Sequence, residues 1–158
     1  MRVVLQRVSN AEVSVSGETI GRVGSGLLVL AAFSRQDDEN DLIWMARKIV
    51  DLRVFVDDNG NLNLSLRDIR GQLLVVSQFT LYGDCKKGRR PSYSHAAPPA
   101  QAEALYNRFI EIARKAVPDV QTGRFQAEME VRLTNDGPVT LILDSSRLTA
   151  ACREPSLM

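Results

Sequence analysis

Histidine and cysteine are both scarce in this chain. Its 158 residues contain one histidine, His95, and two cysteines, Cys85 and Cys152. A metal site with two histidine ligands from one chain is therefore excluded, and a serine or cysteine triad would have to use His95. The cysteines lie far apart and form no C-x-x-C motif, so we expect neither a disulfide framework nor a thiolate zinc site. A catalyst built from this chain is poor in the usual proton carriers.

Long apolar runs are also missing. No segment approaches the roughly 20 apolar residues that cross a bilayer, and the apolar run after Arg2 is too short for a signal peptide. The length suits one domain, and 44% hydrophobic with 25% charged residues is typical of a soluble globular protein. We therefore expect a cytoplasmic protein without a membrane partner.

Charge of one sign is not in excess, because the net charge is only +1, and no overall field attracts nucleic acid. The local distribution is uneven, since four cations lie within residues 86–90: Lys86, Lys87, Arg89 and Arg90. Together with Tyr93 they make a donor-rich loop that suits phosphates. A solvated loop is an equally good interpretation of this stretch alone.

The hydrophobic pattern predicts one mixed domain. Strands are expected at residues 2–8, 11–24 with a tight turn at Ser16-Gly17, 26–33, 53–56, 62–66, 72–80, 127–133 and 139–144. Helices at about 38–51 and 100–116 each carry one apolar stripe, and residues 57–61 and 134–138 are typical of hairpin turns. The sum is an α/β (α+β) fold, a mostly antiparallel, curled or barrel-like sheet with two packed helices. We expect a single domain over residues 1–144 and a C-terminal tail of unknown role over 145–158.

One predicted strand changes character before it ends. Residues 73–76 are apolar, but the next four are Ser77, Gln78, Phe79 and Thr80. They indicate either a strand that leaves the core or polar groups held rigidly at a cleft, where ligand sites tend to lie. A nucleophilic hydroxyl here would need a base. His95 is the one conventional base in the chain, and Asp84 would be a weak one near neutral pH.

A second stretch, TNDGPVT at residues 134–140, contains Gly137 and Pro138. Its composition favours a hairpin turn in which Pro138 opens the next strand. The peptide bond before Pro138 is expected to be trans on composition alone, since cis bonds are rare even before proline. A cis bond would be a rigid, unusual element and would indicate function.

Taken together, the chain resembles the D-aminoacyl-tRNA deacylases, also called D-tyrosyl-tRNA(Tyr) deacylases. The resemblance covers roughly residues 1–144 and rests on the stretches MRVVLQRV, GLLVL, LLVVSQFTLYGD, RRPSY, AEALY, TGRF and TNDGPVT. The combination of SQFT and NDGPVT at this separation is specific, whereas either alone is weak. The resemblance implies a homodimer without metal or organic cofactor that hydrolyses the ester between a D-amino acid and the 3′ end of tRNA.

The resemblance also implies roles for particular residues. Residues 77–80 match the family's active-pocket motif. Gly137-Pro138 matches a Gly-cisPro motif that reaches into the pocket of the partner subunit, and Arg7 matches an arginine that fixes this dipeptide. Phe125 and Met129 are expected to line the site.

Two mechanisms are compatible with the resemblance. We favour one in which the tRNA 2′-hydroxyl helps to activate water while main-chain N–H groups near Phe79 and Thr80 polarise the ester carbonyl. The alternative is an acyl-enzyme formed by Thr80. Chiral selection is expected from a main-chain wall that excludes L side chains and lets glycine through. Two rival functions are a non-catalytic tRNA-binding module and a small-molecule esterase that uses His95.

Overall fold

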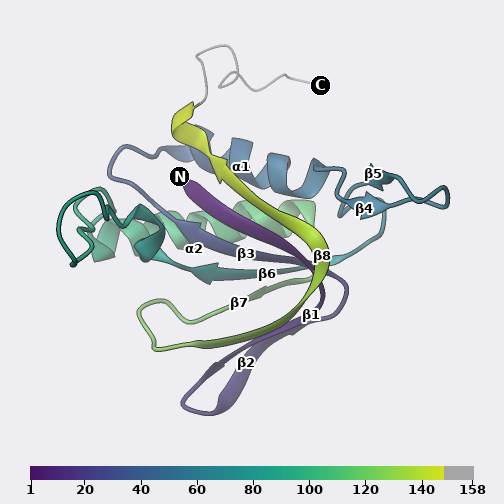
Figure 1. Ribbon diagram of the computed structural model, residues 1–158, viewed down its shortest axis with the longest axis horizontal. Coiled ribbons are helices and arrows are strands. Elements are labelled where there is room, and N and C mark those ends of the chain that lie inside the picture. The colour runs from purple at the N-terminus through teal and green to yellow at the C-terminus, as the bar shows by residue number, and fades with distance from the viewer. Residues whose placement is uncertain (148–158) are drawn as a thin grey trace.

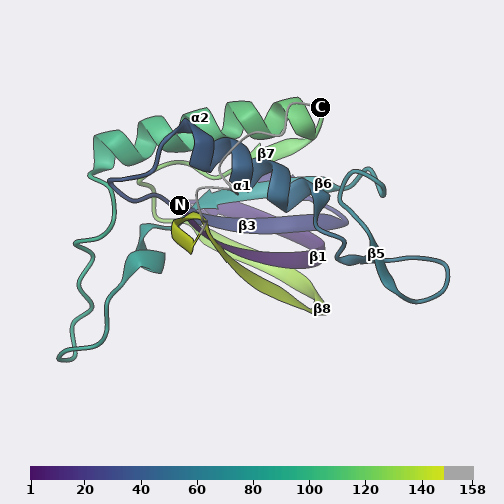
Figure 2. The ribbon, with the colours of Figure 1, turned by 90° about the horizontal axis from the view of Figure 1, so that it is seen from above.

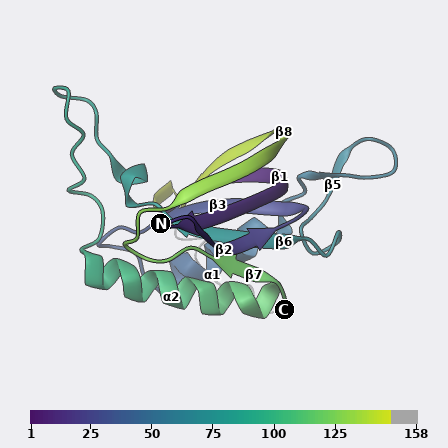
Figure 3. The ribbon, with the colours of Figure 1, turned by 90° about the horizontal axis from the view of Figure 1, so that it is seen from below.

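The computed structural model of this chain describes residues 1–147. Within them, six strands form one sheet in the order β2-β1-β3-β6-β7, with β8 paired to β1. These strands are β1 (Arg2–Val15), β2 (Glu18–Val23), β3 (Gly26–Ala32), β6 (Gln72–Ser77), β7 (Val120–Thr122) and β8 (Glu130–Asp144). A separate two-stranded sheet joins β4 (Phe55–Val56) and β5 (Leu62–Leu64). The helices α1 (Glu39–Asp51) and α2 (Pro99–Ala116) pack together against one side of the large sheet, and β8 runs alongside β1 at the edge of the sheet away from β6 (Figure 1, Figure 2, Figure 3).

Long strands produce the curl of the sheet. One edge of β1 pairs with β3 through Arg2–Val8 and then with β2 through Ala11–Val15, while the other edge pairs with β8. The predicted combination of a curled, barrel-like sheet and two packed helices is confirmed. The sheet is mixed, however, because β3 pairs parallel with β6, and β6 with β7.

Two hydrophobic clusters explain why the central strands have no polar face. Leu27 and Val29 of β3 belong to the cluster between the sheet and the helices, whereas Leu28 belongs to a second cluster. Leu73 and Leu74 of β6 divide in the same way. Alternate side chains of a strand point to opposite faces, so both faces of these strands are buried. The prediction of a central buried strand at 26–33 is therefore confirmed.

The first helix starts where its cap places it. Asp38 accepts hydrogen bonds from the main-chain nitrogens of Asn40 (2.8 Å) and Asp41 (3.2 Å), and the Asp41 carboxylate accepts one from the Asp38 nitrogen (3.1 Å). This reciprocal arrangement satisfies donors that the first helical turn leaves free. Predicted helix 38–51 is confirmed, and so is helix 100–116, which begins with Pro99 in its first turn.

Several boundaries differ from the prediction, and β7 was not predicted. The prediction of a hairpin turn at 134–138 is wrong, because β8 runs unbroken from Glu130 to Asp144. Both halves of β8 pair with the same partner, β1, which is itself continuous where two strands were predicted. The pairing of β1 with β8 shifts register between Gln6 and Val8 and between Val8 and Asn10. These shifts accommodate the residues of β8 that have no partner in β1, so neither strand ends there. Strand β6 ends at Ser77 rather than at residue 80.

The described part of the chain ends in a short 3₁₀ turn, η2 (Ser145–Arg147), and the Ser145 nitrogen donates to the Met1 carbonyl at 2.9 Å. The remainder of the predicted tail, 148–158, lies outside the described residues. Among residues 1–147, no helix is both long enough and apolar enough to span a membrane.

Candidate active site

The chain leaves the sheet at the end of β6. The Gln78 nitrogen donates to the Ala31 carbonyl at 2.8 Å, and residues Phe79–Tyr82 then form a 3₁₀ turn, η1. Phe79 is 56% exposed and packs edge-on against Tyr93, with ring centroids 5.1 Å apart. The residues after the buried strand therefore form a turn at the surface, and the strand, which is buried on both faces, fixes where the turn begins.

One hydrogen-bond donor, rather than a base, contacts the hydroxyl of Thr80. The Gln78 side-chain amide donates to it, and within residues 1–147 no carboxylate or histidine hydrogen-bonds to it. The turn is closed by the Leu81 nitrogen on the Gln78 carbonyl (3.2 Å) and the Gly83 nitrogen on the Thr80 carbonyl (2.9 Å).

The main-chain N–H groups of Phe79 and Thr80 donate to no acceptor among the described residues. Two fixed donors that face no internal acceptor can bind an oxygen that gains negative charge. The backbone of this turn therefore has the chemistry of an oxyanion site, whereas the Thr80 side chain lacks the base that a nucleophile needs.

The loop after β7 brings Phe125 and Met129 to the end of β6. The Gly123 nitrogen donates to the Val75 carbonyl at 3.0 Å, and a Cβ on Gly123 would lie 2.6 Å from the Met129 sulfur. The Phe125 ring lies against Tyr106, with centroids 5.9 Å apart, and the Tyr106 hydroxyl donates to the same Val75 carbonyl at 3.0 Å. Burial raises the pKa of Tyr106 to about 12, so this hydroxyl stays protonated.

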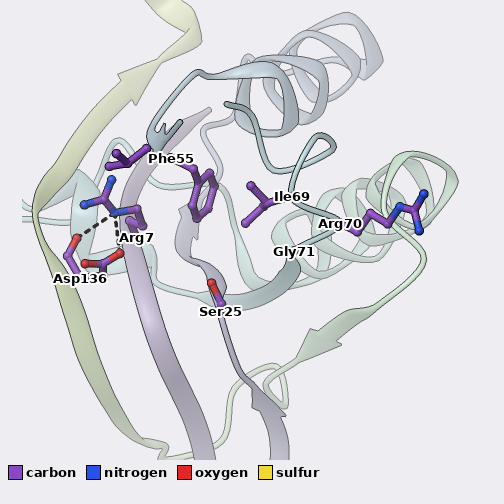
Figure 4. Close-up of a pocket in the computed structure, with 8 residues that line it drawn as sticks. Arg7, Ser25, Phe55, Ile69, Arg70, Gly71 and Asp136 are labelled. Atoms are coloured by element: carbon purple, nitrogen blue, oxygen red, sulfur yellow. Dashed lines mark hydrogen bonds and ion pairs between the residues drawn. The ribbon is translucent and has the colours of Figure 1, made fainter. Parts of the chain in front are cut away.

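Arg7 and the glycyl-proline form a second group. The Arg7 side chain is 5% exposed and donates to the carbonyls of Val54 (2.5 Å), Asp136 (3.0 Å) and Gly137 (3.1 Å). It also pairs with the Asp136 carboxylate at 2.9 Å (Figure 4). The Gly137–Pro138 peptide bond is cis, as the resemblance implied and composition alone did not.

A pocket of about 400 Å³ lies beside Arg7, and Figure 4 shows its lining. It is lined by Arg7, Ser25, Phe55, Val56, Ile69, Arg70, Gly71 and Asp136. This pocket therefore belongs to the Arg7 end of the molecule, not to the turn that carries Thr80.

One copy of the chain does not bring the two motifs together. In the sheet, Arg7 pairs with Leu27 and Leu27 with Leu73, whereas Ser77 lies four positions further along β6. At about 3.3 Å per residue, this offset is roughly 13 Å along the strand direction. Gly137-Pro138 is held at the Arg7 end and is exposed, so it is displaced from residues 77–80 of its own chain.

The four predicted phosphate-binding cations lie on a projecting arm, which we define as residues 84–92. Its ends are joined by paired hydrogen bonds between Asp84 and Ser92, at 2.8 and 3.0 Å. Figure 2 and Figure 3 show it extending away from the sheet and helices. All four cations are exposed, and within residues 1–147 none forms an ion pair with a carboxylate.

Arg2 was not predicted as a site residue, yet it contacts the turn. Its Nη1 donates to the Leu81 carbonyl at 2.9 Å. No sequence pattern links residues 2 and 81, because the contact depends on how β1 and η1 are placed in space. In the described part of the chain, no group of three or more histidine, cysteine, aspartate or glutamate residues is placed to hold a metal ion.

Comparison with known proteins gives consistent matches over nearly the whole chain. The model of the D-Tyr-tRNA(Tyr) deacylase family matches residues 4–144. A D-aminoacyl-tRNA deacylase of Thermosipho africanus is 55% identical over 94% of this chain and 99% of its own length. A solved structure titled c-Myc DNA unwinding element binding protein is 43% identical, with a TM-score of 0.87 over 91% of this chain and 98% of that one. A probable eukaryotic D-amino acid tRNA deacylase shares the fold, with a TM-score of 0.78 at 21% identity over 90% of this chain and 97% of that one.

These matches define the class first: the chain is an enzyme, a hydrolase of ester bonds. More particularly, it belongs to the D-Tyr-tRNA(Tyr) deacylase family.

Proposed function

We propose that this protein hydrolyses the ester between a D-amino acid and the 3′ end of tRNA, releasing the free amino acid and the tRNA. Family membership supports this substrate. The observation on the molecule that carries the proposal is the pair of main-chain N–H groups, on Phe79 and Thr80, that have no acceptor within residues 1–147. Because the substrate is aminoacyl-tRNA, we place the reaction in the cytoplasm.

In this mechanism the protein contributes position and dipoles. Water adds to the ester carbonyl carbon, and the carbonyl oxygen takes up negative charge against the two N–H groups. Collapse of this intermediate breaks the bond to the ribose 3′ oxygen, which takes a proton as it leaves. The neighbouring ribose 2′-hydroxyl helps to activate the water, which fits a turn that offers no titrating base.

The alternative is attack by Thr80 to form an acyl-enzyme. The Thr80 hydroxyl accepts a hydrogen bond from Gln78 and meets no base among the described residues, which favours the water mechanism. Thr80→Ala should therefore keep most of its turnover, while a 2′-deoxy substrate should be hydrolysed far more slowly. Near-complete loss in Thr80→Ala, with tRNA still bound and the 2′-deoxy substrate still cleaved, would favour the nucleophile.

Selection of the D-enantiomer is proposed to come from the Gly137-Pro138 main chain of a second copy. Within one chain this dipeptide is offset from Ser77 by roughly 13 Å along the sheet, so a shared site needs a second copy, for which we propose a twofold dimer. Large apolar side chains are exposed on β8, with Ile142 at 72% and Leu133 at 36%, and a partner subunit would cover such residues. A main-chain wall cannot move aside for an L side chain, whereas glycine has nothing for it to reject.

Mixed dimers test this shared site. A subunit in which Gly83, at the end of the turn, is replaced by leucine has a damaged turn, and a subunit carrying Pro138→Ala has a damaged wall. Each variant alone should lose selective hydrolysis, but co-refolding them should restore up to about one selective site per mixed dimer. No restoration by subunits that do exchange would contradict a shared site.

Binding of tRNA is proposed to use the arm at residues 84–92. Its four cations, which form no ion pair within the described part of the chain, would contact phosphates, so affinity should fall as salt rises. Replacing all four with glutamine should weaken tRNA binding and reduce the slope of log affinity against log salt by up to about four. An unchanged slope would remove the arm from the binding surface.

Release of D-tyrosine from D-tyrosyl-tRNA by the purified protein tests the function itself. A non-catalytic binding module would bind this tRNA without releasing the amino acid. A small-molecule esterase would cleave simple esters and lose that activity in His95→Ala. We expect release of D-tyrosine, with little effect of His95→Ala, because His95 is exposed and has no hydrogen bond to the turn within residues 1–147.

A further inference from the structure

Arg2 joins three separate parts of the chain. Its Nη1 donates to the carbonyl of Leu81 in η1 at 2.9 Å, and its guanidinium carbon lies 4.9 Å from the centre of the Tyr82 ring. On the opposite side, its Nε and Nη2 each lie 2.9 Å from the Asp144 carboxylate at the end of β8. The guanidinium therefore lies between the sheet and the turn that carries the proposed oxyanion donors.

The ends of two strands fix Arg2 in place. Arg2 and Asp144 are paired residues in the β1–β8 ladder, so the main chains that carry them are held together. The Asp144 side chain is 6% exposed and that of Arg2 is 36% exposed. One carboxylate oxygen of Asp144 accepts a hydrogen bond from the Arg2 Nε and forms an ion pair with its Nη2, and these two contacts restrict the orientation of the guanidinium plane.

The turn depends on such external contacts because it has few internal ones. Its four residues form one 3₁₀ turn, and hydrogen-bond geometry in 3₁₀ turns is poorer than in α-helices. Arg2 binds the Leu81 carbonyl directly and lies over the ring of the next residue, Tyr82. Movement of Leu81 would re-aim the N–H groups of its two preceding neighbours, Phe79 and Thr80.

We propose that Arg2 is a positioning residue for the reaction. It holds η1 against the ends of β1 and β8, and so sets the direction in which the Phe79 and Thr80 N–H groups point. This inference rests on the proposed function, since those two groups matter only if they bind the developing oxyanion. Lysine cannot replace the arginine, because a single ammonium cannot offer a planar fork to a carboxylate and lie over an aromatic ring together.

The test compares Arg2→Met and Arg2→Lys with the wild type, using Arg22→Met as a matched control. Arg22 is also a strand arginine paired with the carboxylate of a neighbouring strand, that of Glu12, to which it donates two hydrogen bonds, but it contacts no part of η1. The kcat and KM for D-tyrosyl-tRNA are measured well below each variant's melting temperature. Loss of positioning should lower kcat by roughly 10- to 100-fold, because small displacements of catalytic groups have effects of this size, and leave KM within about threefold.

The expected result is a fall in kcat in both Arg2 variants and none in Arg22→Met. Asp144→Asn supplies a second arm that keeps the Leu81 contact, and we expect a smaller fall in kcat there. Variants that melt earlier but keep the wild-type kcat when folded would show a purely structural role and overturn the proposal, as would full activity of Arg2→Lys. If the wild type itself releases no D-tyrosine, the proposed function fails instead, which separates the two failures.

Discussion

Replacing Arg7 with methionine removes the anchor of the Gly137-Pro138 segment while keeping most of the apolar stem. Val54 is only 5% exposed, so its carbonyl would be left without a hydrogen-bond donor. This should lower the free energy of unfolding by about 1–3 kcal/mol. The carbonyls of Asp136 and Gly137 belong to exposed residues, so water can replace the hydrogen bonds from Arg7 and losing these bonds costs less. The ion pair with Asp136, whose side chain is 56% exposed, adds at most about 1 kcal/mol. The total is about 3 kcal/mol.

For a domain of this size, about 3 kcal/mol lowers the melting temperature by roughly 6–12 °C. Thermal unfolding measures this loss, and Arg132→Met is the control. Arg132 is 70% exposed, and its ion pairs within residues 1–147 are with the half-buried Glu12, at 3.5 Å, and the exposed Glu130, so the free energy of unfolding should change by less than about 0.5 kcal/mol. At a temperature where Arg7→Met is folded, its preference for D- over L-tyrosyl-tRNA should fall at least tenfold, since the segment is no longer fixed. A variant that melts early but discriminates as well as the wild type would refute the role of Arg7 in selection.

Three further predictions concern stability. Burial works to raise the pKa of Asp144, but hydrogen bonds from Ser146 and Arg2 and the Arg2 charge lower that pKa below its ordinary 3.8. The ionised Asp144 carboxylate therefore stabilises the fold above about pH 4, and this stabilisation is lost as the pH falls further. In urea unfolding, the difference in free energy of unfolding between wild type and Asp144→Asn should be smaller at about pH 3 than at about pH 6. A difference that does not depend on pH would contradict this. Asp38→Ala removes the cap of α1 and should cost about 1 kcal/mol in the same assay, whereas no change would mean that the cap is dispensable. Gly26→Ala places a Cβ 1.9 Å from the Gln72 carbonyl oxygen, so it should prevent folding or lower the melting temperature by more than about 10 °C, and a wild-type melting curve would show that β3 and β6 pair differently.

Local patterns predicted the elements whose identity depends on their own residues. The run at 26–33 is apolar because alternate side chains enter two different clusters, and helix 38–51 carries both its cap and its apolar stripe in sequence. The hairpin at Asn59-Gly60 was likewise predicted from its turn residues, and β4 pairs with β5 across it. In each case the relevant neighbours lie within a few positions along the chain.

Features decided by distant neighbours were not predictable in this way. Asn135 to Pro138 have the composition of a turn, yet pairing with β1 keeps β8 continuous through them. The Asn135 side-chain amide assists by donating to the carbonyls of Arg7 and Val139, at 2.9 and 3.2 Å. The contact from Arg2 to Leu81 spans 79 positions and leaves no periodic trace. The motifs at 77–80 and 137–138 were found through the resemblance, whereas their separation within one chain required the sheet register.

In the proposed mechanism a main chain, rather than a side chain, rejects the natural enantiomer at a site that polarises an ester. Rates of release of D-tyrosine, L-tyrosine and glycine from their tRNAs, measured side by side with one enzyme preparation, test it most directly. We predict rapid release of D-tyrosine, measurable release of glycine and release of L-tyrosine at least about 100-fold slower than that of the D-form. Equal rates for the two enantiomers, or complete exclusion of glycine, would contradict the account.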